Sequence, residues 1–333
     1  MNAAILSRQL GRTGPSTFPI GLGCMSFSGM YGAYDTAAGI DTIHAALDSG
    51  VTLLDTGDFY GNGSNEMLIG QALKGRRHEA QLSVKFGALR DPAGGFSGYD
   101  ARPVAVKNFL AHSLTRLGTD YVDIYRPSRL DPQVPIEDTI GAIADLVQAG
   151  YVRHVGLSEV GVATIRRAAA VHAIADLQIE YSLLSRGPEA DILPVLDELG
   201  IGVTAYGVLS RGLLTGSTPT DARDFRQHLP RFAGAAGVAN RKLAEALHDI
   251  AASRSVTAAQ LAIAWVMSRG AHIVPLVGTR TRAQLQDALG AARVSLNATD
   301  LAQLATAIPA DAVQGTRYAA ALMQHLDSET STR

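Results

Sequence analysis

The sequence has little that would suit a secreted, membrane-spanning or nucleic-acid-binding protein. Cys24 is the single cysteine among 333 residues, so no disulfide can form within the chain, which fits a reducing compartment. No uninterrupted apolar run reaches the roughly 18 residues of a spanning helix, and the opening MNAAILSRQLGRTG lacks the apolar stretch of a secretory signal. These absences predict a soluble cytoplasmic protein without a membrane partner.

Charge and short motifs exclude further classes. The 29 basic and 31 acidic residues give a net charge of −2, which offers no basic field for nucleic acid. HxH, HExxH, GxSxG and GxxxxGK[ST] are all absent, which argues against a metal-dependent barrel hydrolase, an α/β-hydrolase and a P-loop enzyme. The run GLGCMS at 21–26 lacks the third glycine of a Rossmann fingerprint, and no tyrosine is followed four residues later by lysine, as in short-chain dehydrogenases.

The chain alternates short β-branched or apolar runs with longer amphipathic stretches. Helical patterns such as 37–50, 103–118 and 136–150 each end in glycine, which closes a helix before the next strand. This rhythm predicts a single domain over residues 1–333, an α/β fold of the (β/α)8 barrel type, with an open doubly wound sheet as the alternative. The expected strands are 18–23, 51–56, 81–86, 121–126, 152–158, 176–182, 202–206 and 272–277.

Three segments interrupt the alternation and are candidate functional loops. Residues 87–100 follow the third expected strand, residues 207–238 follow the seventh, and a tail extends beyond about residue 308. Barrel active sites are built from loops at the carboxyl ends of the strands, so the first two lie on the expected face.

Three side chains near the ends of the second and third strands stand out. Asp55 ends the second strand, Lys85 ends the third, and Tyr60 lies in the loop after Asp55. Adjacent strand ends converge in a barrel, and a lysine that closes an apolar strand is costly to bury without a carboxylate partner. The residues therefore predict one small site, although a structural ion pair beside a surface tyrosine would fit the same pattern.

A series of motifs resembles the aldo-keto reductase superfamily over nearly the whole chain. LGRTG and PIGLGCMSF resemble its opening hairpin and first strand. DTGDFYGNGSNE, VKFG, DYVDIY, GLS, QIEYSLLSR, TAYGVLSRGLLTG and PLVGTR follow in the family order. The resemblance implies a barrel that binds a nicotinamide cofactor in an extended form and reduces a small carbonyl compound.

The resemblance also implies roles for individual residues. Tyr60 would donate a proton to the substrate carbonyl, Lys85 would lower the pKa of Tyr60, and Asp55 would hold Lys85. An unperturbed tyrosine has a pKa of ~10, and a neighbouring ammonium favours the phenolate. Ser128 stands where the family usually has a histidine that polarises the substrate oxygen, so we expect a roomier, slower or differently selective site.

The positions that match the family's cofactor contacts imply NADPH (NADP+). Arg280 suits a 2′-phosphate by bidentate pairing, which favours NADPH over NADH. Glu159 replaces the usual asparagine after Ser158, and Ala288 stands where an adenine-contacting asparagine is frequent. The expected contacts are Ser158, Gln178, Tyr206, Leu209, Arg211, Gly278, Thr279, Arg280, Gln284 and Asp287.

The expected substrate pocket is apolar and aromatic, which suits a moderately hydrophobic aldehyde or ketone. Arg126 and Arg129 are candidates for meeting an anionic substituent such as a phosphate or carboxylate, but for Arg129 a structural ion pair with Asp131 or a neighbour is the favoured interpretation. The expected wall comprises Met25, Met30, Tyr31, Phe59 and Phe86, with Phe96 or Tyr99 as further candidates and core packing as the alternative for Phe86.

Two other functions compete with an NADPH-dependent carbonyl reductase. One is a cofactor-binding sensor or auxiliary subunit with vestigial chemistry, similar to the potassium-channel β-subunit branch. The other is a barrel isomerase that uses Lys85 in a Schiff base. The intact Asp55, Tyr60 and Lys85 favour the reductase, because a binding module needs no tuned acid. A monomer is the default expectation, with a homo-oligomer open.

Overall fold

Eight parallel strands close into a barrel in the computed structural model of the protein, which describes residues 7–219 and 224–330. Each strand pairs with the next one along the barrel, and β12 returns to pair with β3. The predicted (β/α)8 barrel is therefore confirmed, and the open sheet is wrong. The strands are β3 (Gly21–Gly23), β4 (Leu53–Gly57), β5 (Gln81–Phe86), β8 (Val122–Pro127), β9 (Val152–Ser158), β10 (Ile174–Glu180), β11 (Gly202–Tyr206) and β12 (Ile273–Gly278).

The observed strands differ slightly from the predicted ones. The first is shorter because Pro19 has no N–H for the strand ladder, so pairing begins at Gly21. The sixth begins and ends two residues earlier, because Ser182 turns back to pair with Ser185.

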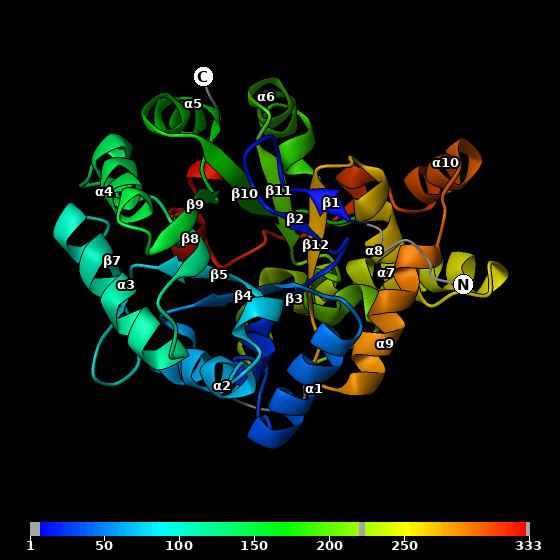
Figure 1. Ribbon diagram of the computed structural model, residues 1–333. Coiled ribbons are helices and arrows are strands. Elements are labelled where there is room, and N and C mark those ends of the chain that lie inside the picture. Colours follow the sequence, from blue (N-terminus) through cyan, green and yellow to red (C-terminus); the bar gives the residue numbers. More distant parts are fainter. Residues whose placement is uncertain (1–6, 220–223, 331–333) are drawn as a thin grey trace.

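Helices surround the barrel (Figure 1). The predicted glycine stop is seen at Gly118, which ends α3 in the left-handed conformation with φ 63°. The helices are α1 (Thr36–Asp48), α2 (Ser64–Ala72), α3 (Pro103–Leu117), α4 (Ile136–Gln148), α5 (Val162–Val171), α6 (Ile192–Leu199), α7 (Gly234–Ser253), α8 (Ala258–Ser268), α9 (Arg282–Gly290), α10 (Ala298–Ala307) and α11 (Ala320–Met323).

Within the described ranges, no single helix is both long enough and apolar enough to span a bilayer. Helices α7 and α8 together have a suitable length and composition, but the chain bends by 92° between them.

The main hydrophobic core lies between the strands and the helices. Every residue of β10 is buried, as expected for a parallel strand covered on both faces. Helix α4 contributes Ile136, Ile140 and Ile143, which recur at helical spacing on its buried face.

A hairpin closes the amino-terminal end of the barrel, where β1 (Arg8–Gln9) pairs with β2 (Ser16–Thr17) (Figure 1). Leu10 between them is fully buried in a cluster with Ile124 and Val274. Gly11 has φ +61°, and a Cβ there would lie 2.5 Å from the nitrogen of Gly202, so only glycine fits. The open end of the barrel is therefore the carboxyl end.

The three interrupting segments fold into small elements, with residues 220–223 of the second outside the described residues. Residues 87–100 form a hairpin of β6 (Ala88–Arg90) and β7 (Phe96–Tyr99). The rings of Phe96 and Tyr99 pack on His325 of the tail, with ring centroids 5.5 Å apart in each pair. Residues 207–238 contain the 3₁₀ turns η5 (Ser210–Thr215), η6 (Phe225–His228) and η7 (Pro230–Phe232), and the tail contains α11.

Candidate active site

Asp55 and Lys85 form a buried ion pair at the ends of β4 and β5. The parallel register places Asp55 beside Ser83 and Gly57 beside Lys85, which brings the two charges to one side of the barrel. Ser83 Oγ and Gln178 Nε2 also donate to Asp55 Oδ2, at 2.8 and 2.7 Å. The carboxylate therefore has the partners that a buried charge requires.

Tyr60 begins the 3₁₀ turn η2 (Tyr60–Gly63) that follows β4. Its ring lies 5.1 Å from Lys85 Nζ, lines the same pocket as Lys85 and Asp55, and makes an edge contact with Phe59 at 4.8 Å. No described residue hydrogen-bonds to the Tyr60 hydroxyl. The structure thus brings together the three side chains that the sequence predicts as one site.

The turn that carries Tyr60 is fixed from two sides. The Asp58 N–H donates to the Lys85 carbonyl at 2.8 Å, which joins the turn to β5. Asn65 is fully buried, accepts a hydrogen bond from Thr56 Oγ1 at 2.7 Å and donates to the Cys24 carbonyl at 2.9 Å. The glycines and Asn62 in the motif permit the positive φ angles of this turn.

The electrostatics of Tyr60 differ from the sequence prediction. Burial, followed by the charge of Asp55, raises the pKa of Tyr60 well above its usual value, whereas the charge of Arg129 lowers it. Burial also lowers the pKa of Lys85. Lys85 is not among the main influences on the pKa of Tyr60, because it is paired with Asp55, so a Tyr60 pKa lowered by Lys85 stays a prediction.

Asp58 is a second unusual acid beside the site. Gly87 N donates to its Oδ2 at 3.2 Å, but its Oδ1 is buried without a partner among the described residues. Burial raises the pKa of Asp58 to about 7, against the lowering effect of the Gly87 hydrogen bond.

The pocket wall is largely the predicted one. Met25, Met30, Tyr31 and Phe59 line it together with the three reactive candidates. Phe86 does not line it and instead stacks on Tyr125 with ring centroids 4.4 Å apart, so the core interpretation of Phe86 is correct. Phe96 and Tyr99 are also outside the wall, because the β6–β7 hairpin packs against the tail; the structure adds Phe225, Tyr318 and Leu322.

A second pocket adjoins the first and continues away from Tyr60. The two share Ser26, Tyr31, Gly207, Arg211, Leu276 and Gly278. The predicted positions Leu209, Thr279, Arg280, Gln284 and Asp287 all line the second pocket, as does Ala288. Two adjoining pockets with the predicted contacts along both suit an extended dinucleotide.

Two buried hydroxyls support this fit to a dinucleotide. Thr279 Oγ1, in the second pocket, has no hydrogen-bond partner among the described residues, and the same is true of Ser158 Oγ, although Ser158 lines neither pocket. A buried polar group without a partner is costly, so such groups commonly serve a ligand or an ordered water. Arg280 lines the second pocket; its guanidinium has no carboxylate of the described residues within 4.0 Å and makes one hydrogen bond to them, from Nη1 to the Tyr31 carbonyl at 3.4 Å.

Several predicted cofactor residues also bind other parts of the protein. Gln178 donates to Asp55 as described above. Arg211 Nη2 donates to Glu180 at 2.7 Å, so its charge is compensated before any phosphate arrives. Asp287 accepts hydrogen bonds from Thr257 and Gln260, both at 2.9 Å, and so links α9 to the start of α8.

Ser128 and the two arginines near it are placed differently from one another. Ser128 is 2% exposed, does not line the pocket, and its Oγ has no partner among the described residues. Arg126 is fully buried and donates to Asp176 at 2.9 Å inside the barrel, so its predicted contact with a substrate anion is wrong. Arg129 lines the pocket, and the suggested Arg129–Asp131 ion pair does not form.

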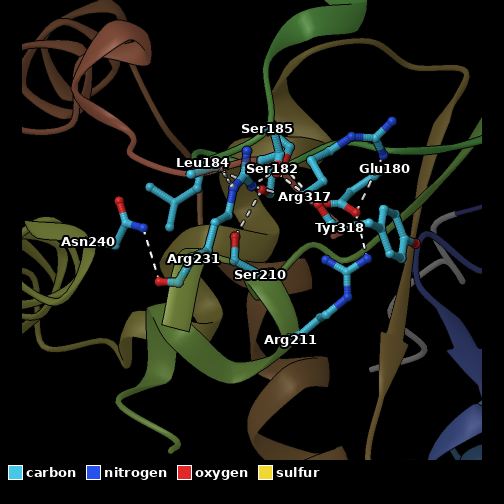
Figure 2. Close-up of polar contacts among 12 residues, drawn as sticks. Glu180, Ser182, Leu184, Ser185, Ser210, Arg211, Arg231, Asn240, Arg317 and Tyr318 are labelled. Carbon is cyan, nitrogen blue, oxygen red and sulfur yellow. Dashed lines mark hydrogen bonds and ion pairs between the residues drawn. The ribbon is translucent and has the colours of Figure 1, made fainter. Parts of the chain in front are cut away.

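The tail is anchored by a cluster of buried charges that sequence reasoning missed (Figure 2). Arg317 donates to both carboxylate oxygens of Glu159, at 2.9 and 2.8 Å, and lies 3.4 Å from Glu180. Glu159 also accepts from Ser328 Oγ at 2.6 Å and from Tyr206 Oη at 2.7 Å. The substitution of Glu159 for asparagine was visible in the sequence, but its partner lies 158 residues away.

Among the residues that the structure describes, no group of three or more histidine, cysteine, aspartate or glutamate side chains has an arrangement that could hold a metal ion. The charged groups of the site are instead paired with one another or face the pockets.

Comparisons with known proteins place related sequences beside this chain. The model of the aldo/keto reductase family matches residues 19–309. A protein from Glycine max called probable aldo-keto reductase 1 is 38% identical over 325 residues, which cover 95% of this chain and 92% of that protein.

Solved structures are similar over nearly the whole chain. The aldo-keto reductase AKR11C1 from Bacillus halodurans, in its holo form, has a TM-score of 0.78 at 27% identity, covering 92% of this chain and 97% of that one. The glycerol dehydrogenase AKR11B4 from Gluconobacter oxydans has a TM-score of 0.83 at 24% identity, covers 99% of each chain, and is similar in fold.

Proposed function

Because this chain belongs to the aldo/keto reductase family, we propose that it reduces an aldehyde or ketone to the alcohol with NADPH, and that Tyr60 is the proton donor. One observation carries this proposal: Tyr60, Lys85 and Asp55 meet at the wall of one pocket, and this pocket continues into a second. A structural ion pair alone would not require a tyrosine in the wall of the same pocket.

The chemistry of Tyr60 supports donation rather than removal of a proton. Its raised pKa keeps the phenol protonated at neutral pH, so a proton is available for the oxygen of a reduced carbonyl. Lys85 lies at the ring and stabilises the phenolate that remains after donation, while Asp55 holds the ammonium in place.

The proposed cofactor contacts other than Ser158 are divided between the two pockets. When bound, NADPH supplies the hydride that the protein itself cannot provide. Ser158, Gln178 and Tyr206 would hold the nicotinamide end; Gln178 Nε2 is committed to Asp55, which leaves its amide oxygen as an acceptor. Leu209 and Arg211 would lie along the middle, and Gly278, Thr279, Arg280, Gln284 and Asp287 would surround the adenosine phosphate.

Arg280 is the proposed basis of a preference for NADPH over NADH. Loss of a charge-assisted contact to the 2′-phosphate weakens binding by roughly 10- to 100-fold. We therefore expect Arg280→Gln to raise the Kd for NADPH by that factor and to leave the Kd for NADH nearly unchanged. Arg282→Gln is a matched control, because Arg282 is nearby but pairs with Asp41 at 2.9 Å. Equal losses for both cofactors would contradict the assignment.

The first experiment follows the reduced-nicotinamide absorbance with purified protein, NADPH and an activated aromatic aldehyde. We expect turnover in the wild type and a loss of roughly 10²- to 10⁴-fold in Tyr60→Phe. NADPH affinity, measured by fluorescence, should change little because the phenol acts on the carbonyl. A loss of NADPH binding in Tyr60→Phe would contradict the assigned role.

The alternative, a cofactor-binding sensor, predicts NADPH binding without turnover of any aldehyde in the same assay. The cytoplasmic location and the monomeric state expected from the sequence remain predictions.

A further inference from the structure

The charges around the pocket do not balance within the protein. Asp55, Lys85, Arg129 and Arg211 are the charged side chains in its wall. Asp55 and Lys85 pair with each other, and Arg211 pairs with Glu180 behind the wall. No carboxylate of the described residues lies within 4.0 Å of Arg129, so its charge has no partner of opposite sign.

The position of Arg129 explains why it remains unpaired. It follows β8. Its Nη1 donates a hydrogen bond to the Ser128 carbonyl at 2.6 Å, which holds one nitrogen of the guanidinium in place. Asp131, its nearest acid in the sequence, accepts the backbone N–H groups of Ala101 and Gln133 at 3.1 and 2.9 Å. Arg129 Nε and Nη2 have no hydrogen-bond acceptor among the described residues.

The neighbouring acid, Glu159, is already paired with other residues. Burial lowers the pKa of Arg129, but Tyr206 and Tyr318, and after them the charge of Glu159, raise it above its usual value. However, Arg317 and Ser328 bind this carboxylate directly. The anchoring cluster as a whole is balanced, because its three carboxylates face three guanidinium groups: Glu159, Glu180 and Glu329 with Arg211, Arg231 and Arg317.

The hydroxyl of Tyr318, which also lines the pocket, cannot add a donor. Tyr206 gives its single proton to Glu159 at 2.7 Å, so in the 3.0 Å contact between the two tyrosines Tyr318 is the donor to Tyr206. Much of the remaining wall is apolar, including Met25 and Leu322. An unpaired guanidinium in such surroundings binds an oxyanion more strongly than it would in water.

We propose that the carbonyl substrate bears a carboxylate and that Arg129 binds it by the free edge of its guanidinium. The inference rests on the proposed reductase function, because the carbonyl end must lie at Tyr60 in the same pocket. Arg129 lines this pocket and not the second, so it does not serve the phosphate end of the cofactor. A single negative charge matches the single excess positive charge, whereas a phosphate dianion would leave a charge unpaired.

A matched pair of aldehydes tests the specificity. Para-carboxybenzaldehyde and para-formylbenzamide have nearly the same shape and differ in charge. For the wild type with NADPH, we expect kcat/KM to be about 10- to 100-fold higher for the carboxylate. Arg129→Gln should bring the ratio near one, and Arg129→Lys should retain part of it because the charge remains. Arg102→Gln, which removes an exposed guanidinium bound to Asp100, should leave the ratio unchanged.

A binding measurement separates this inference from the proposed function. Benzoate, titrated calorimetrically into the full-length protein, should bind the wild type at least ten times more tightly than Arg129→Gln. If neither aldehyde is reduced but this difference is seen, the reductase proposal fails and the carboxylate site stands. The carboxylate site is wrong if both aldehydes are reduced with equal kcat/KM. It is also wrong if benzoate binds the wild type and Arg129→Gln with the same affinity. Faster reduction of a phosphorylated benzaldehyde than of the carboxylate would also overturn it.

Discussion

Two buried charge clusters lie near the carboxyl end of the barrel, and they are built differently. The first is the Asp55–Lys85 pair, whose residues come from neighbouring strands. The second is the anchoring cluster, where Arg317 of the tail reaches Glu159 and Glu180. Both satisfy the requirement that a buried charge have partners, and Lys85 of the first also lies at the ring of Tyr60 in the pocket wall.

The clusters differ in how many hydrogen bonds their charged groups make within the protein. Glu159 accepts five hydrogen bonds, from the Glu180 N–H, Tyr206, Ser328 and two nitrogens of Arg317, and no acceptor capacity remains for a ligand. Among the residues that the structure describes, Lys85 has one side-chain hydrogen-bond partner, Asp55, and its ammonium lies next to the Tyr60 ring. A fully paired cluster holds a segment in place, whereas a partly paired one is available for chemistry.

The largest expected effect comes from breaking the first cluster. Lys85→Met leaves Asp55 buried without its cation, so we expect a loss of about 3–5 kcal/mol in the free energy of unfolding together with loss of aldehyde reduction. Asp55→Asn/Lys85→Met should recover most of the stability without the activity, as measured by urea denaturation. Unchanged stability in Lys85→Met would mean that Ser83 and Gln178 suffice for Asp55.

Breaking the anchoring cluster should cost slightly less stability. Arg317→Met removes one cation from Glu159 and Glu180, but Arg211 and Ser328 remain, so we expect a loss of about 3 kcal/mol. Because Tyr318 is adjacent, KM for aldehydes should rise more than kcat falls. Arg167→Gln, which breaks an exposed pair with Glu137, should cost less than about 1 kcal/mol. Equal losses in the two variants would refute the anchoring role.

Asp58 provides an intermediate case, because one of its oxygens is bound and the other is not. Its pKa of about 7 lies above the unfolded value of ~3.9, so the folded protein binds the extra proton. This contribution to stability is complete below about pH 4 and is lost as the pH rises through about 7.

Asp58→Asn should remove that loss, because the side chain stays neutral at every pH. We expect the variant to exceed the wild type by about 1–3 kcal/mol at about pH 8, after the cost of an unpaired amide, and to lose this advantage near pH 4. Denaturation curves at several pH values measure the difference. Parallel pH profiles for the two proteins would show that Asp58 does not titrate in this range.

Substitution of Ser128 should have the smallest effect on activity and stability. Its hydroxyl is buried, unpartnered and outside the pocket wall, so we expect Ser128→Ala to change kcat/KM by less than about threefold and to raise stability by up to about 1 kcal/mol. A tenfold loss of kcat/KM with normal NADPH binding would instead place the Ser128 hydroxyl in the reaction.

The success of the sequence predictions depended on how local each signal was. The strand ends with Asp55 and Lys85 were predictable, because parallel strands of a barrel must converge and each strand is a continuous apolar run. The positions of Arg126 and Arg129 were not separable, because a shift of three residues at the end of β8 decides between the barrel interior and the pocket. The tail was predicted to be a functional loop, but the contact between its Arg317 and Glu159 was not predicted.

The sequence alone determined the barrel, the resemblance to the aldo-keto reductases and the grouping of Asp55, Tyr60 and Lys85, because strand periodicity and motif order are local properties. Only the tertiary structure decided which charges are paired. Arg211 pairs with Glu180 and Arg317 pairs with Glu159, whereas Arg129 lines the pocket with no carboxylate partner among the described residues. Such pairings join segments far apart in the chain, and the energy of a buried charge depends on its neighbours in space rather than in sequence.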